Sequence, residues 1–157
     1  MKPALLRSLL FVPGNNWRLI ESGKRISEVD AIILDMEDAV PIDDKETARW
    51  FVRDAVRELK EVGHFIVVRV NSISSNLIEE DLKAVVQRGV DAIMLPKTES
   101  REDVLMLEDM LLKEEQAKGL EPIGVIPLIE SARGILNAYE IALASRRVIA
   151  LAFGAAD

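Results

Sequence analysis

The 157-residue sequence contains no cysteine and few aromatic residues. Without cysteine the chain has no disulfide bond, no thiolate metal site and no cysteine nucleophile, which fits an intracellular protein. Aromatic residues make up 4% of the chain and hydrophobic residues 49%, so the core must be aliphatic. An aliphatic core rich in Ile, Leu, Val and Ala is typical of parallel strands covered by helices.

Long basic clusters and long apolar runs are also missing. The net charge is −7, and this acidic balance argues against a nucleic-acid partner. No stretch approaches the roughly 18 consecutive apolar residues that cross a membrane. The apolar run at residues 1–7 is too short for a signal peptide. We therefore expect a cytoplasmic protein that binds neither nucleic acid nor membrane.

Short apolar runs alternate with helical patterns along the whole chain. The predicted strands are 8–12, 31–35, 65–70, 92–95, 124–129 and 148–153, and the predicted helices are 17–25, 43–61, 79–88, 100–118 and 132–144. Regular alternation predicts a parallel sheet with right-handed crossovers. Both an open doubly wound sheet and a (β/α)₈ barrel fit this pattern. The absence of a glycine-rich dinucleotide fingerprint after the first strand weakens the former.

Polar residues recur directly after the predicted strands. They are Asn15 and Asn16, Glu37 and Asp38, Arg69 and Asn71, Lys97 and Glu99, Glu130, and finally Asp157. In a barrel, the carboxyl ends of all strands meet at one rim, where functional residues lie. The pattern thus favours one shared rim, although six strands cannot close a barrel of eight.

Glu130 and Asp157 each end an apolar strand, where an unpaired charge is costly. Carboxylates at such positions suit Mg²⁺, which commonly takes one or two protein carboxylates together with water and substrate. The alternative is that Glu130 caps the helix starting at Ser131 and that Asp157 is merely a chain end. Spacing alone does not separate the two interpretations.

Arg69 interrupts the apolar run 65–70, and a guanidinium at a strand end suits bidentate binding of a substrate carboxylate. In a half-exposed strand it would be an ordinary outward-facing residue. Glu37 and Asp38 can support a metal-bound water, orient Arg69 or cap the next helix. Lys97 can meet an anionic ligand or remain solvated. His64, the single histidine, is expected at the surface.

Taken together, these motifs resemble the citrate lyase β-subunit family, within the HpcH/HpaI-type aldolases. The matching segments are Arg7–Asn15, Ile33–Pro41 with Lys45 and Arg49, Val68–Asn71, Leu95–Ser100, Pro127–Asn137 and Ala150–Asp157. They follow the family order and cover nearly the whole chain.

The resemblance implies a TIM barrel with Mg²⁺ held by Glu130 and Asp157. It also implies that Arg69 faces the substrate oxygens and that Glu37, with Asp38 beside it, supports the water around the metal. Asn71 and Lys97 are then expected to contact substrate. The implied reaction is retro-Claisen cleavage, or the reverse condensation, of a 2-hydroxyacyl thioester of CoA or of an acyl carrier, such as citryl-CoA, malyl-CoA or citramalyl-CoA. The products are an acyl-CoA and a 2-oxo acid.

The resemblance is incomplete at one end, because relatives continue for two more strands and a further segment. We expect residues 1–157 to form a single incomplete barrel domain with unpaired strand edges and weak or no lyase activity alone. Thioester hydrolysis, a malate-synthase-like condensation and a non-catalytic subunit remain alternatives. The family also implies a homo-oligomer, either a trimer or a hexamer.

Overall fold

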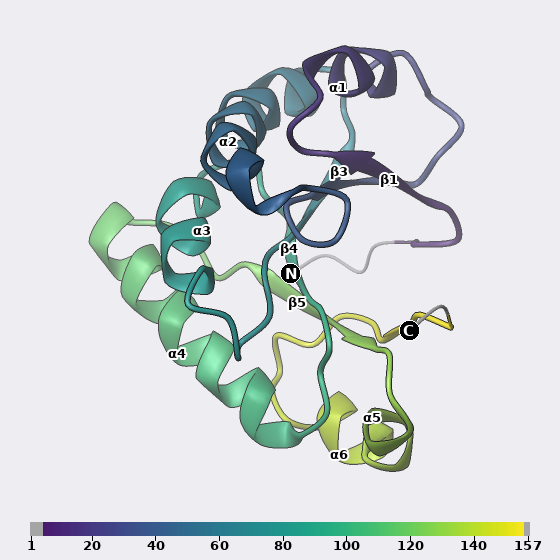
Figure 1. Cartoon of the computed structure of the whole chain (residues 1–157), viewed down its shortest axis with the longest axis vertical. Helices are drawn as coiled ribbons and strands as arrows, with labels where there is room; N and C mark the ends of the chain where they lie inside the picture. Colours follow the sequence, from purple (N-terminus) through teal and green to yellow (C-terminus); the bar gives the residue numbers. More distant parts are fainter. Residues whose placement is uncertain (1–4, 156–157) are drawn as a thin grey trace.

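The computed structural model describes residues 5–155 and shows six parallel strands that curl into a half-barrel (Figure 1). The strands are β1 (Leu9–Pro13), β2 (Ala31–Asp35), β3 (Phe65–Arg69), β4 (Ala92–Leu95), β5 (Gly124–Ile129) and β6 (Ala152–Phe153). Each strand pairs with the next one along the chain, in the order β1-β2-β3-β4-β5-β6. This order identifies the sheet as barrel-type, since a doubly wound sheet reverses its strand order at a switch point.

Helices pack on the outer side of the curl (Figure 1). They are α1 (Trp17–Gly23), the 3₁₀ turn η1 (Ile42–Asp44), α2 (Lys45–Glu61), α3 (Ile78–Val85), α4 (Arg101–Lys118), α5 (Ala132–Leu136) and α6 (Ala138–Ala142). Among residues 5–155, no helix is long and apolar enough to cross a membrane.

Both faces of the sheet are apolar. Ile32 and Leu34 belong to the outer cluster under the helices, whereas Ile33, Val67 and Met94 belong to a second cluster inside the curl. Successive side chains of a strand point to opposite faces, so a strand covered on both faces must be apolar throughout. This explains why the predicted limits of β2, β4 and β5 match the observed ones.

The sixth strand was predicted over residues 148–153, but regular pairing is confined to Ala152–Phe153. An isolated bridge joins Val125 to Val148, whereas Leu128 pairs with Ala152. An advance of three residues along β5 therefore corresponds to an advance of four residues along the facing segment 148–152. Pro127 lies between these contacts and has no N–H to donate, which accounts for the interrupted ladder.

Two other expectations were wrong. The helix predicted over 132–144 is two short helices divided at Asn137, whose side chain donates to the Glu99 carbonyl at 2.8 Å. His64 is buried, with 8% of its surface exposed, and is not a surface residue.

Candidate active site

Glu130 follows β5 directly and is held at the carboxyl-terminal rim from two sides. The backbone N–H of Lys97 donates to Glu130 Oε2 at 2.7 Å. A Cβ added to Gly154 would lie 3.0 Å from Glu130 Cγ, so the Gly154 backbone packs closely against this side chain. Lys97 reaches its position with φ at 52°, and no other non-glycine residue of the described chain has a positive φ. The Glu130 carboxylate is therefore held by backbone groups of neighbouring chain segments.

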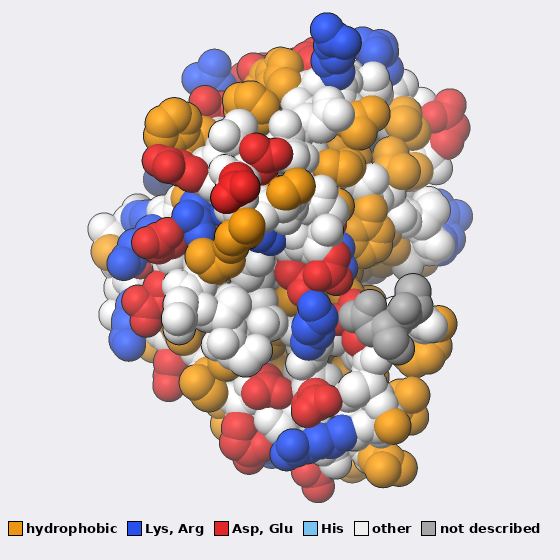
Figure 2. Space-filling view, viewed as in Figure 1, with side chains coloured by type: hydrophobic (Ala, Val, Ile, Leu, Met, Phe, Trp, Pro, Cys, Tyr) orange, Lys and Arg blue, Asp and Glu red, His pale blue; other side chains and the backbone are white. Residues whose placement is uncertain are grey.

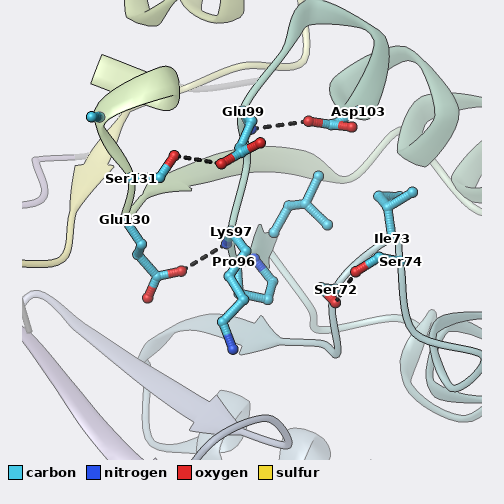
Figure 3. A pocket seen from close by; sticks show the side chains of 11 residues that line it. Ser72, Ile73, Ser74, Pro96, Lys97, Glu99, Asp103, Glu130 and Ser131 are labelled. Atoms are coloured by element: carbon cyan, nitrogen blue, oxygen red, sulfur yellow. Dashed lines mark hydrogen bonds between the residues drawn. The ribbon is translucent and has the colours of Figure 1, made fainter. Parts of the chain in front are cut away.

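A cavity of about 640 Å³ opens beside Glu130 (Figure 3). The loops after β3, β4 and β5 form its walls, which are lined by Ser72, Ile73, Ser74, Leu95, Pro96, Lys97, Glu99, Asp103, Glu130, Ser131 and Ala132. In Figure 3 the Lys97 side chain extends away from Glu99 and Ser131. Figure 2 shows acidic and basic side chains side by side near the middle of this face.

Asp157, the second predicted metal ligand, lies outside the described residues. Within residues 5–155, no group of three or more acidic or histidine side chains is placed to surround a metal. The Glu130 and Asp157 pair therefore stays a prediction. Gly154, which touches Glu130, precedes Asp157 by three positions in the sequence.

The Lys97 ammonium joins this site to the acids after β2. Its Nζ lies 2.8 Å from Glu37 Oε1 and 3.3 Å from Asp38 Oδ1. These two carboxylates raise the pKa of Lys97, mainly through the hydrogen bond to Glu37. Lys97 thus holds Glu130 by its backbone and the two other acids by its side chain.

Glu37 is 5% exposed, and its two oxygens differ. Oε1 accepts from Lys97, whereas Oε2 is the buried side-chain oxygen that has no hydrogen-bond partner among the described residues. Arg69 Nη1 approaches Oε2 at 3.2 Å, but without the direction of a hydrogen bond. Burial, together with the nearby Asp38 charge, raises the pKa of Glu37 overall, although Lys97 and Arg69 act to lower it. Burial also acts to raise the pKa of Asp38, but the Lys97 hydrogen bond helps to lower it overall.

Arg69 ends β3 and pairs with a carboxylate that the sequence analysis did not single out. Its Nε and Nη2 donate to Asp35 at 2.7 and 2.6 Å. The guanidinium carbon lies 5.0 Å from the centre of the Phe11 ring. Asp35 is the last residue of β2, and Glu130 directly follows β5. The observation that selected Glu130, an acid at the end of an apolar strand, therefore applies to Asp35 as well.

Asn71 lies beneath the rim, 4% exposed. Its Nδ2 donates to the Met36 carbonyl and to Asp81, and its Oδ1 accepts from Lys45 at 2.8 Å. Lys45 Nζ also donates to the carbonyls of Met36 and Glu37 at 2.7 Å each. Asn71 and Lys45 therefore hold the loop that carries Glu37. That Asn71 or Lys97 contacts substrate stays a prediction, because the observed contacts of both side chains are internal.

The two asparagines after β1 also have structural partners. Asn16 caps α1, accepting from the Leu19 N–H at 3.2 Å, and Asn15 donates to Asp44 at 2.9 Å. Neither residue lines the cavity.

The charges at the rim favour a cation. Asp35, Glu37, Asp38 and Glu130 face the cations Arg69 and Lys97, with buried Lys45 below them. Carboxylates therefore outnumber cations even when Lys45 is included. A hard cation that takes one or two protein carboxylates fits an oriented Glu130 in this negative surrounding.

A protein-family model described as HpcH/HpaI aldolase/citrate lyase matches residues 7–157. The citrate lyase subunit beta of Escherichia coli (strain K12) is 43% identical over 153 residues, which are 96% of this chain and 50% of the relative. The L-malyl-CoA/beta-methylmalyl-CoA lyase of Cereibacter sphaeroides (strain ATCC 17025 / ATH 2.4.3) is 35% identical, over 96% of this chain and 48% of the relative. The chain thus spans about half the length of these relatives.

A solved structure, the citrate lyase beta subunit of M. tuberculosis complexed with oxaloacetate and magnesium, has the same fold. Its TM-score is 0.73 at 29% identity, over 98% of this chain and 60% of that one. CitE of Mycobacterium tuberculosis in complex with magnesium, acetoacetate and coenzyme A gives a TM-score of 0.71 at 30% identity, over 96% of this chain and 50% of that one.

Proposed function

This chain belongs to the HpcH/HpaI aldolase/citrate lyase family, and we propose that it supplies the cation and keto-acid site of a carbon–carbon lyase. The substrate is a 2-hydroxyacyl thioester such as citryl-CoA, malyl-CoA or citramalyl-CoA, which is cleaved to an acyl-CoA and a 2-oxo acid. The observation that carries the proposal is the Glu130 carboxylate, fixed by the Lys97 N–H beside a cavity of about 640 Å³.

The cation is Mg²⁺, and Glu130 is its ligand, with Asp157 as a second proposed ligand. When bound, Mg²⁺ supplies a Lewis acid and a template for the oxygens of the keto acid. The excess of carboxylates at the rim supports this assignment, since it attracts a cation and repels an anionic ligand when no cation is bound. Glu37 and Asp38, which share the Lys97 ammonium, support the water around the cation in this proposal.

Arg69 donates to the oxygens of the keto acid. Its Nε and one Nη2 hydrogen are engaged by Asp35, and Nη1 lies 3.2 Å from Glu37 Oε2. The donors that can turn to a ligand therefore lie at the Nη1–Nη2 end of the fork. This end provides the geometry for a carboxylate and the charge that stabilises a developing carbonyl oxygen. In this proposal Lys97 and Asn71 orient other residues. A single domain over residues 1–157 and assembly into a trimer or hexamer stay predictions.

Binding is the first test, because it needs no turnover. Isothermal titration calorimetry of the chain with Mg²⁺ and then pyruvate should show pyruvate binding only after the cation is added. Glu130→Gln keeps the shape but removes the charge, and we expect Mg²⁺ affinity to fall at least about tenfold. The exposed Glu140 on α6 provides the control, since Glu140→Gln removes the same charge away from the cavity. Wild-type Mg²⁺ affinity in Glu130→Gln would refute the proposal.

The reaction itself is tested by its products. A lyase releases a 2-oxo acid from citryl-CoA or citramalyl-CoA in a Mg²⁺-dependent manner and leaves the thioester of the acyl-CoA product intact. Release of free coenzyme A thiol without a 2-oxo acid would instead identify hydrolysis. Consumption of an acyl-CoA and a 2-oxo acid with release of both a free hydroxy acid and coenzyme A thiol would identify a malate-synthase-like condensation.

A further inference from the structure

Asp35 is a buried carboxylate that accepts from four hydrogen-bond donors. It is 1% exposed at the end of β2. Oδ1 accepts from Arg69 Nε at 2.7 Å and from the Glu37 N–H at 2.9 Å. Oδ2 accepts from Arg69 Nη2 at 2.6 Å and from the Ala39 N–H at 3.3 Å. One side chain thus fixes both a guanidinium and the turn that carries Glu37.

The guanidinium of Arg69 is restrained in two directions by these contacts. Asp35 occupies the Nε–Nη2 edge, and Phe11 lies 5.0 Å from the guanidinium carbon. A charged hydrogen bond to an ionised partner is stronger and more directional than a neutral one. Arg69 therefore keeps one orientation at the rim, where 11% of its side chain is exposed.

We infer that Asp35 is a positioning residue that aims the Nη1–Nη2 end of Arg69 at the bound 2-oxo acid and, through the 37–39 turn, sets Glu37 beside it. The inference rests on the proposed function for the identity of the ligand, but not for the orientation of Arg69. Asp35 itself has no surface left to touch a ligand, so its effect must pass through Arg69 and Glu37.

The opposite end of the same strand provides a matched control. Asp30 directly precedes β2 and accepts from Arg7 Nε and Nη2 and from the N–H groups of Arg7 and Ser8. It therefore binds an arginine fork and two backbone N–H groups, as Asp35 does. Its arginine is 70% exposed and lies away from the rim. Asp30→Asn removes the same kind of contact without touching Arg69.

The experiment measures two quantities in wild type, Asp35→Asn and Asp30→Asn. The first is the affinity for oxalate, an unreactive analogue of a 2-oxo acid, by calorimetry at saturating Mg²⁺. The second is the solvent exchange of the Arg69 Nε–H in ¹⁵N-labelled protein, assigned with Arg69→Lys. We expect Asp35→Asn to weaken oxalate binding at least about tenfold and to speed the exchange, while Asp30→Asn changes neither.

Each outcome decides a separate claim. A folded Asp35→Asn variant that binds oxalate as tightly as wild type overturns the inference. If that variant does not fold, Asp35→Glu keeps the charge but displaces the fork by one methylene, and wild-type affinity in it has the same meaning. If wild type binds no oxalate, the proposed function fails. The exchange of the Arg69 Nε–H then decides the role of Asp35, and unchanged exchange in Asp35→Asn overturns it.

Discussion

The two ends of the half-barrel each contain a largely buried arginine paired with carboxylates, but their polar groups are satisfied to different degrees. At the amino ends of β5 and β6, Arg147 is 8% exposed and donates to both oxygens of Glu115 at 2.6 and 2.8 Å. Glu115 Oε1 also accepts from the Ile123 N–H. Arg147 Nε reaches Glu108 at 3.2 Å. The charged groups of this cluster therefore satisfy one another.

The carboxyl-terminal rim has equally close contacts, but its charged groups do not all satisfy one another. Among residues 5–155, Glu37 Oε2 is buried without a hydrogen-bond partner, and Lys97 adopts a left-handed φ that a lysine rarely takes. Carboxylates outnumber cations there, because Asp35, Glu37, Asp38 and Glu130 share Arg69, Lys97 and Lys45.

The difference fits a stabilising amino-terminal end and the functional carboxyl-terminal end that we propose. Polar groups that satisfy each other add to stability, whereas unsatisfied charge and backbone strain persist where a ligand completes the site. In barrels the amino-terminal face serves stability and the carboxyl-terminal face serves chemistry. Substitutions of the same type at the two ends should therefore have unequal effects on the free energy of unfolding.

The largest effect is expected for Glu115→Gln. It removes the charge of the buried carboxylate that binds Arg147 through both oxygens and leaves the guanidinium with Glu108 alone. Breaking a buried ion pair costs about 3–5 kcal/mol. Chemical denaturation measures this loss. Glu108→Gln is the control: Glu108 contacts the same arginine with a side chain that is 31% exposed, so the loss should stay below about 1 kcal/mol. Equal losses of stability in the two variants would show that the Arg147 cluster does not depend on Glu115 more than on Glu108.

An intermediate effect is expected from the backbone of Lys97. Lys97→Gly and Lys97→Ala both remove the ammonium, but only glycine relieves the positive φ. The glycine variant should therefore be more stable than the alanine variant by about 1 kcal/mol. Gly119, at φ 62° after α4 with no atom within 4 Å of an added Cβ, gives the reference cost through Gly119→Ala. Equal stability of the two Lys97 variants would mean that the rim stores no strain there.

The sequence predicted the regular parts of this comparison. Apolar runs located β2, β4 and β5 to the residue because both faces of the sheet are buried. The rule that polar groups after strands share one rim brought Glu37, Arg69, Lys97 and Glu130 into one neighbourhood. The apolar run 148–153 overestimated β6, because the missing N–H of Pro127 in β5 interrupts pairing in the neighbouring strand.

The contacts within the rim were beyond sequence reasoning. Lys97 and Glu37 are 60 positions apart, and their pairing depends on how far the sheet curls. Lys45 and Asn71 meet only after α2 docks against the sheet. The role of Asp35 was not predicted for a different reason. Asp35 was counted as the last residue of the strand 31–35, and only Glu37 and Asp38 were counted as the polar residues after it.

The smallest effect is expected for Glu37→Gln, and it should depend on pH. Burial raises the pKa of Glu37 above its ordinary 4.5, so the folded chain binds this proton more tightly than the unfolded chain. The stability that this proton provides is complete below pH 4.5 and is lost as the pH rises through the folded pKa. Glutamine does not titrate, so the stability of Glu37→Gln relative to wild type should rise with pH over that window and then level off. Denaturation midpoints from pH 4.5 to 8 test this, with Glu140→Gln correcting for the loss of one surface charge. A difference that stays constant or falls with pH would place the unsatisfied rim charge on a residue other than Glu37.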